Sequence, residues 1–197
     1  MARWEPGTPE RLQKAALELF ATRGFEQTTA MEIAQSVGLT ERTFFRHFSD
    51  KREVLFSGQH LLVQAFLAGV DAAPPEAAPL EIVAFALRSA ASYFPDERRP
   101  YARLRQSVID RNPALEEREL HKLAGLATTI GDALRARGVE PLAAALAAKS
   151  GVTVFEVAFT LWIAEGEERS LADLSADVLR ALLTLTVEGG AARRTPS

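Results

Sequence analysis

Residues 28–51 of this 197-residue chain decide its fold, and they read TTAMEIAQSVGLTERTFFRHFSDK. Thr29 is followed three residues later by Glu32, a capping-box pattern that predicts the start of a short helix. Gly38 predicts the end of that helix, and Thr40 predicts the cap of a second one. Two short helices joined by a tight turn that contains glycine are typical of a helix-turn-helix.

The second short helix, predicted over residues 41–47, has two different faces. Phe44 and Phe45 are adjacent, so they point about 100° apart around the helix and one of them must lie near the surface. Several side chains on the free face can donate hydrogen bonds to phosphates and base edges. They are Thr40, Arg42, Thr43, Arg46 and His47. From the charges alone, a helical hairpin with a solvated face is an equally good interpretation.

The charge distribution favours a local rather than a general affinity for nucleic acid. The formal net charge of the chain is −3, whereas a protein that binds nucleic acid over its whole surface would be strongly basic. Residues 42–52 carry four basic side chains and one acidic side chain, apart from His47. Any contact with DNA must therefore come from this patch.

The rest of the chain also favours helices. Alanine and leucine number 34 and 25, and both are strong helix formers. Cysteine is absent, which excludes disulfides and thiolate metal sites. The sequence predicts an all-α protein of about nine helices, with a three-helix DNA-binding domain at its N-terminus. The expected divisions are a helix-turn-helix domain over 8–68 with the motif at about 31–50, a larger helical domain over 69–190, and a tail over 191–197.

The stretch Arg11–Phe56 resembles the DNA-binding domain of TetR-family transcriptional regulators. The resemblance rests on Ala15, Leu19-Phe20, Arg23-Gly24-Phe25, Thr28-Thr29, Glu32-Ile33-Ala34, Val37-Gly38-Leu39, Thr43-Phe44-Phe45-Arg46-His47-Phe48 and Lys51. It implies that Thr40–His47 is the recognition helix in the major groove and that Thr29 and Lys51 contact phosphate. Phe45 stands where the family usually has Tyr, so a hydroxyl that would reach a phosphate is missing. The expected DNA-binding residues are Thr29, Thr40, Arg42, Thr43, Phe45, Arg46, His47 and Lys51.

The larger C-terminal part carries no catalytic motif, and we expect no enzyme, no cofactor and no metal site. Its last two helices, at about 141–188, are unusually apolar, and residues 152–163 are apolar on nearly all sides. That pattern predicts a partner surface, although a central helix in a monomer is an alternative. In TetR-like proteins the last two helices form a four-helix dimer interface. The resemblance therefore implies a homodimer that reads a palindromic operator in double-stranded DNA.

A ligand pocket is expected among the helices of this C-terminal part. Aromatic and apolar residues with a few polar groups are usual for such a site. The expected lining is Phe66, Leu87, Tyr93, Leu104, Arg105, Val108, Phe155, Phe159 and Trp162. The stretch Tyr101–Leu115 and Trp162 resemble a TetR subgroup with an acyl-CoA-like ligand-binding domain. This implies an apolar or acyl-type effector.

These observations favour a cytoplasmic, homodimeric repressor that a small molecule releases from its operator. We expect no secretory signal and no membrane-spanning helix. Two alternatives remain. One is a helical enzyme or binding protein for a lipid-like molecule that never touches DNA. The other is a constitutive DNA-binding protein whose C-terminal part only dimerises.

Overall fold

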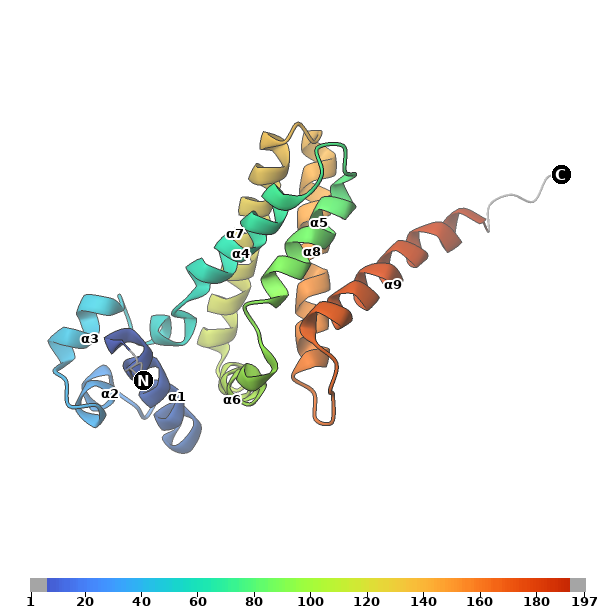
Figure 1. Cartoon of the computed structure of the whole chain (residues 1–197). Coiled ribbons are helices and arrows are strands. Elements are labelled where there is room, and N and C mark those ends of the chain that lie inside the picture. Colours follow the sequence, from blue (N-terminus) through green and yellow to red (C-terminus); the bar gives the residue numbers. More distant parts are fainter. Residues whose placement is uncertain (1–6, 192–197) are drawn as a thin grey trace, which may run out of the picture. The chain divides into compact units, whose positions relative to one another are not determined.

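The computed structural model describes residues 7–191, which form nine α-helices and two short 3-10 helices, with no strand among them (Figure 1). This confirms the expected all-α class and the expected number of helices. Residues 192–197 of the expected tail lie outside the described residues. The bounds are α1 Thr8–Arg23, α2 Ala30–Ser36, α3 Glu41–His47, η1 Arg52–Phe56, α4 Gln59–Ala72, α5 Pro79–Ala91, η2 Asp96–Arg98, α6 Arg99–Ile109, α7 Pro113–Ala136, α8 Pro141–Trp162 and α9 Leu171–Ala191.

The chain divides into two compact units, and each has its own packing. Unit 1 contains the residues up to 60 together with residues 100–122, and unit 2 contains the remainder. The sequence predicts continuous domains instead. The second segment belongs to unit 1 because Val108, Ile109 and Leu115 are buried in the same hydrophobic cluster as the side chains of α1.

Most helix limits follow the capping residues expected from the sequence. The hydroxyl of Thr29 accepts the N–H of Glu32 at 3.2 Å, and the carboxylate of Glu32 accepts the N–H of Thr29 at 2.8 Å, so the capping box is complete. Gly24 ends α1 with a positive φ of 94°. The run Thr8-Pro9-Glu10 predicts Thr8 as the cap of α1, but Thr8 is already helical and Gly7 is the N-cap, whose carbonyl accepts the N–H of Arg11.

The apolar spacing after Asp50 predicts one long helix from residue 51 to about residue 70, but the structure has two segments there. The 3-10 helix η1 ends at Phe56, and α4 begins at Gln59. Between them Gly58 has a φ of +83°, a conformation that cannot continue a right-handed helix. The η1 turn buries three successive side chains, Val54, Leu55 and Phe56, because unit 1 surrounds this segment on several sides.

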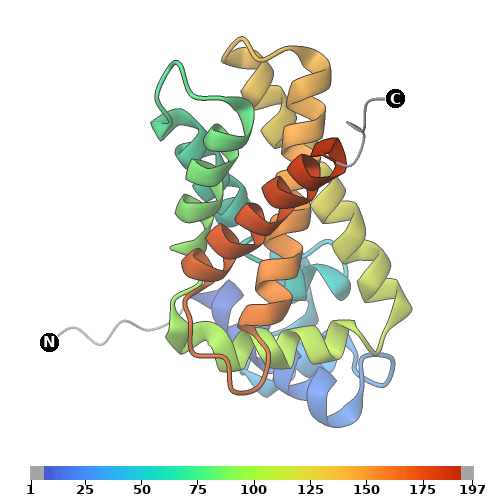
Figure 2. The same ribbon diagram turned by 90° about the vertical axis from the view of Figure 1, so that its right-hand side faces the viewer.

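Unit 2 depends on close approach between helices. A Cβ placed on Gly69 of α4 would lie 2.5 Å from both the Cα of Ala86 and the carbonyl oxygen of Phe85 in α5. A Cβ on Gly151 of α8 would lie 2.7 Å from the side chain of Val83. Glycine thus lets α5 pack against both neighbours, and α9 packs on α8 and α5 (Figure 2).

Two helical segments are apolar and long enough to cross a membrane by length and composition alone, Arg52–Ala72 and Pro141–Trp162. Length and composition alone do not decide whether a helix spans a membrane, so the expectation of no membrane-spanning helix stays a prediction. Gly58 interrupts the first segment. The second is α8, which buries Val154, Phe155 and Ala158 in unit 2. We interpret both segments as parts of the helical packing.

Gly69→Ala and Gly125→Ala test the packing of unit 2, because both glycines lie inside helices but only Gly69 faces another backbone. Alanine at Gly69 must push α4 away from α5, so we expect a loss of about 1–3 kcal/mol in the free energy of unfolding. Gly125 has no neighbour within 4 Å, so alanine there is expected to add about 0.5–1 kcal/mol through helix propensity. Urea denaturation of both variants measures the difference, and equal effects of the same sign would contradict the packing.

Candidate nucleic-acid interface

The turn between α2 and α3 is held by backbone hydrogen bonds that depend on a left-handed residue. Gly38 has a φ of +74°, its N–H donates to the carbonyl of Gln35 at 3.0 Å, and the N–H of Leu39 donates to Ala34 at 2.9 Å. These are the two bonds of a Schellman motif. The guanidinium of Arg11 in α1 donates to the carbonyl of Val37 at 2.6 Å, which satisfies a further carbonyl at this helix end.

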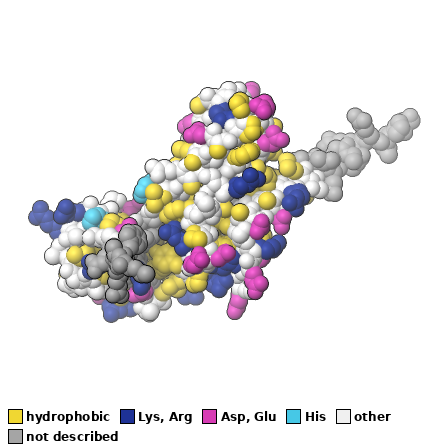
Figure 3. Space-filling view, in the orientation of Figure 1, with side chains coloured by type: hydrophobic (Ala, Val, Ile, Leu, Met, Phe, Trp, Pro, Cys, Tyr) yellow, Lys and Arg dark blue, Asp and Glu magenta, His cyan; other side chains and the backbone are white. Residues whose placement is uncertain are grey.

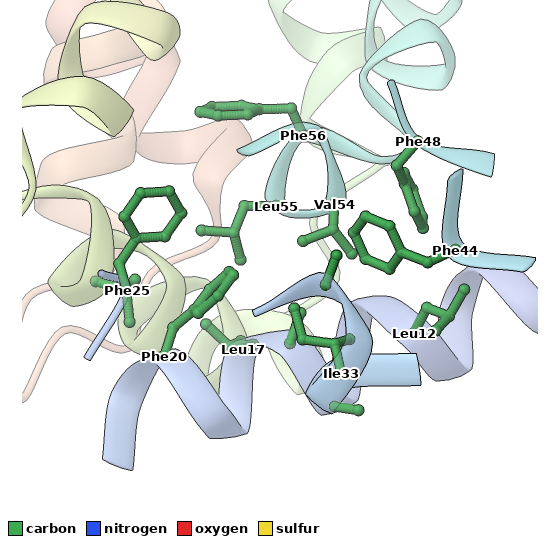
Figure 4. Close-up of a cluster of buried hydrophobic side chains, with 14 of the residues drawn as sticks. Leu12, Leu17, Phe20, Phe25, Ile33, Phe44, Phe48, Val54, Leu55 and Phe56 are labelled. Atoms are coloured by element: carbon green, nitrogen blue, oxygen red, sulfur yellow. The ribbon is translucent and has the colours of Figure 1, made fainter. Parts of the chain in front are cut away.

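Helix α3 is fixed by its cap and by two buried rings. The hydroxyl of Thr40 accepts the N–H of Thr43 at 3.2 Å, and their two hydroxyls lie 3.0 Å apart in a further hydrogen bond. Phe44 is fully buried and Phe48 nearly so. Figure 4 shows both rings on the same side of the hydrophobic cluster as Val54, with the Phe44 ring directed toward Val54. The inner face of α3 is therefore committed to the core.

The outer face of α3 is free. Arg42, Arg46 and His47 are exposed, and Phe45 remains 51% exposed beside the buried Phe44. Within residues 7–191 the two arginines make no hydrogen bond or ion pair. They are four residues apart, so they lie on one side of the helix. Figure 3 shows Lys and Arg side chains projecting from the surface over α3. The face thus offers two unpaired cations beside an exposed ring.

Thr29 and Lys51, the two expected phosphate contacts, both have partners inside unit 1. The hydroxyl of Thr29 also lies 2.9 Å from a carboxylate oxygen of Glu32. The hydrogen bond from the backbone N–H of Thr29 lowers the pKa of Glu32 most, and the hydrogen bond from the Thr29 hydroxyl lowers it further. The ammonium of Lys51 donates to the carbonyl of Phe25 at 2.6 Å and lies 4.0 Å from the centre of the Phe25 ring. Their DNA contacts remain predictions, and their observed role is to hold the ends of α2 and α1.

The residues expected to line a ligand pocket do not all come together. Arg105 and Val108 belong to unit 1, where Val108 is buried in the core, and Leu104 on the same helix is exposed. Leu87 in unit 2 lines a groove between α5 and α9. The other five form an aromatic cluster in unit 2: Phe66, Tyr93, Phe155, Phe159 and Trp162.

Phe94 lies at the centre of this aromatic cluster, and the sequence reasoning missed it. Its ring centroid is 5.4 Å from that of Phe159, 5.8 Å from that of Trp162 and 5.9 Å from that of Phe155. Pro95 predicts a helix that ends at Phe94, whereas α5 ends at Ala91. The indole N–H of Trp162 donates to Asp96 at 3.2 Å, so this ring also carries a polar contact.

Two cavities of about 250 Å³ lie elsewhere. One is the groove between α5 and α9, with Arg88 and Arg180 among its lining residues. The other lies in unit 1 between the ends of α1 and α6, with Phe25 and Asn112 in its wall. Within the part of the chain that the structure describes, no three His, Cys, Asp or Glu side chains are close enough to hold a metal ion.

Comparison with protein families matches residues 12–57 to the model described as bacterial regulatory proteins, tetR family. The HTH-type transcriptional regulator TcmR of Streptomyces glaucescens is 40% identical over 82 residues, which cover 42% of this chain and 36% of TcmR. MftR of Mycobacterium tuberculosis is 33% identical over 67 residues, which cover 32% of this chain and 34% of MftR. Through residues 12–57 the chain is therefore similar to the N-terminal part of TetR-family regulators. The matched region spans about a third of the length of these relatives.

Solved TetR-family structures extend the likeness to most of the chain. FadR from Bacillus subtilis, in complex with stearoyl-CoA, has a TM-score of 0.61 at 21% identity and covers 88% of this chain and 96% of its own. FadR from Thermus thermophilus, a repressor in complex with lauroyl-CoA, has a TM-score of 0.53 at 25% identity, with coverage of 89% and 93%. These likenesses confirm the expected TetR fold, a helix-turn-helix domain followed by a larger helical domain.

Proposed function

We propose that this protein is a sequence-specific DNA-binding transcriptional regulator, a homodimeric repressor that a small apolar or acyl-type ligand releases from a palindromic operator. The observation that carries the proposal is the free cationic face of α3, held on a rigid turn within a TetR-family domain. A helix of this kind fits the major groove, where donor groups can distinguish base pairs.

The contacts divide between bases and backbone. Arg42 and Thr43 are proposed to read base edges, since arginine binds guanine through two hydrogen bonds. Phe45, His47 and Lys51 are proposed to contact the backbone. Because the whole chain has a formal net charge of −3, attraction to DNA is confined to this face, which favours selective over general binding.

Exposed leucines support the proposed homodimer. On α8, Leu142 is 66% and Leu146 is 60% exposed. Val157 and Leu161 are also exposed, and the spacings of four and eleven residues place all four on one broad side of the helix. On α9, Leu185 is also exposed. Apolar side chains gathered on one side of a helix mark an interaction surface. Two copies joined through α8 and α9 would present two α3 helices to the two halves of a palindrome.

The ligand is proposed to act by shifting an equilibrium between two states. One state holds the two α3 helices at the spacing of the operator, and the ligand binds the other state more tightly. The acyl class is suggested by the two FadR proteins, which were solved with stearoyl-CoA and lauroyl-CoA. In this chain the aromatic cluster of unit 2 provides apolar surface for such a molecule.

The two alternative functions predict different observations. A lipid-binding protein or enzyme without DNA binding leaves the free face of α3 unexplained. A constitutive DNA-binding protein requires that no ligand stabilises unit 2, and a screen of acyl compounds by thermal shift separates it from the repressor, because a true ligand raises Tm by linkage.

The variant Arg42→Ala/Arg46→Ala tests DNA binding. Both side chains are exposed, so the fold is expected to persist, while affinity for a duplex selected by the wild-type protein falls at least about 100-fold. Fluorescence anisotropy measures affinity and circular dichroism checks the fold. Arg88→Ala/Arg135→Ala removes the same charge from exposed positions of unit 2 outside α8 and α9, and is expected to bind normally. Specific binding that survives in the α3 variant would refute the assignment of α3.

Phe45→Tyr tests the backbone contact of the exposed ring. A hydroxyl at this position is expected to reach a phosphate and strengthen operator binding about two- to fivefold, since a net hydrogen bond contributes about 0.5–1 kcal/mol. Phe85→Tyr, the same change on α5, serves as control and is expected to leave affinity unaltered. Weaker binding by the Phe45 variant would show that the ring lies in an apolar contact instead.

Leu142→Glu/Leu146→Glu tests the dimer surface. Burying two carboxylates between copies is unfavourable, so sedimentation velocity is expected to show a monomer where the wild-type protein shows a dimer. Leu61→Glu/Leu120→Glu, a matched change at exposed leucines outside α8 and α9, is expected to remain dimeric. If the α8 variant also stays dimeric, the interface lies elsewhere.

A further inference from the structure

The core that holds the proposed recognition helix is not complete within the helix-turn-helix. Val108 and Ile109 of α6 and Leu115 of α7 are buried in the same cluster as Phe44 and Val54. Residues 100–122 thus supply part of the hydrophobic support for α3. The sequence predicts the DNA-binding domain over residues 8–68, and the family match covers residues 12–57.

The segment η1 packs between residues 100–122 and the helix-turn-helix. It begins five residues after α3 ends, and its Val54 lies beside the Phe44 ring (Figure 4). A five-residue 3-10 helix has little stability of its own. Its position depends on the side chains that surround it.

Two ion pairs fix η1 to α7. One carboxylate oxygen of Glu53 lies 2.6 Å from Nε of Arg118, and the other lies 3.1 Å from Nζ of Lys122. The two cations are four residues apart on α7, and all three side chains are at most 31% exposed. Burial acts to raise the pKa of Glu53, but the hydrogen bonds from Arg118 and Lys122 outweigh it and hold the pKa below its usual value. The carboxylate is therefore charged and doubly paired.

Arg105 of α6 holds the other end of η1. Its Nε donates to the carbonyl of Leu55 at 2.9 Å, and its guanidinium pairs with Glu119 at 3.0 Å. Its guanidinium carbon also lies 5.0 Å from the centre of the Phe56 ring, and Nζ of Lys122 lies 5.5 Å from the same ring. Contacts to three of the five residues of η1, Glu53, Leu55 and Phe56, thus come from α6 and α7.

We propose that Glu53 is a positioning residue for DNA binding, which sets the orientation of α3 by tying η1 to Arg118 and Lys122. The inference rests on the proposed function. It adds that residues 100–122 belong to the DNA-binding module and that operator affinity depends on the two contacts between Glu53 of η1 and α7.

The sign of the effect separates positioning from general electrostatics. Glu53→Gln removes one negative charge. The long-range repulsion between the protein and the phosphates then falls, so binding to any duplex becomes slightly stronger. Loss of position instead weakens binding to the correct sequence, because base contacts require the groups to be held in place while phosphate contacts tolerate displacement. Glu18→Gln is the matched control, since Glu18 is an exposed residue of α1 in the same unit.

The experiment uses the full chain, a duplex selected by the wild-type protein from a random pool, and a scrambled duplex of equal length. Glu53→Gln is expected to bind the selected duplex about tenfold more weakly, with the scrambled duplex changed less than about twofold. Glu18→Gln is expected to change neither. In an Arg118→Gln/Lys122→Gln background the same substitution at Glu53 is expected to have an effect below about twofold, because its partners are gone.

Three outcomes overturn the proposal: Glu53→Gln behaves like Glu18→Gln, it loses affinity for both duplexes equally, or its effect persists without its partners. If Glu53→Gln does not fold at the assay temperature, Arg118→Gln replaces it, with the ratio of selected to scrambled affinity expected to fall about threefold and an unchanged ratio contradicting the inference. Failure of the wild-type protein to select any duplex refutes the proposed function itself, a result distinct from all of these.

Discussion

The burial of the Phe44 ring is the interaction on which the other features of α3 depend. A helix of seven residues is too short to be stable in water, since isolated helices shorter than about 12–15 residues are marginal. Phe44 is completely buried, and burial of such a ring contributes about 1.5–3 kcal/mol. With that ring fixed inside, the helix geometry sends Arg42, Phe45 and Arg46 outward. The same contact thus stabilises the segment and exposes the side chains proposed to meet DNA.

The basic side chains of unit 1 fall into two groups, unpaired ones on α3 and ion-paired ones around η1. The side chains of the two arginines on α3 have no partner among the described residues. Around η1, by contrast, each of the cations is paired with a carboxylate: Arg105, Arg118 and Lys122. Paired, half-buried cations restrain the fold, and free, exposed ones remain available to a polyanion. A chain with a small negative net charge can in this way present one local positive face.

Helix ends and turns could be predicted from the sequence where they depend only on neighbouring residues. The capping box at Thr29, the left-handed Gly38 and the cap at Thr40 are each set by neighbouring residues, and all three stand as expected. Contacts between distant segments could not be read in this way. Lys51 binds the carbonyl of Phe25, and Glu53 binds α7 some 65 residues on. No periodicity encodes such pairs, because each requires the two segments to be already packed.

The predicted pocket shows the same limit. Spacing along one helix places Phe155 and Phe159 on the same side, and their rings lie together in the structure. Helical spacing could not show that Arg105 and Val108 belong to unit 1, because that depends on which unit α6 packs into. Phe94 was overlooked because it lies just past the end of α5, where helical spacing no longer indicates a direction.

Selection of bound duplexes from a random pool by the wild-type protein tests the central claim most directly. A dimer that presents two copies of α3 is predicted to enrich an inverted repeat whose half-sites are centred about one helical turn, or a multiple of it, apart. A pool that stays random after selection, or that yields a single unrepeated motif, would contradict the claim.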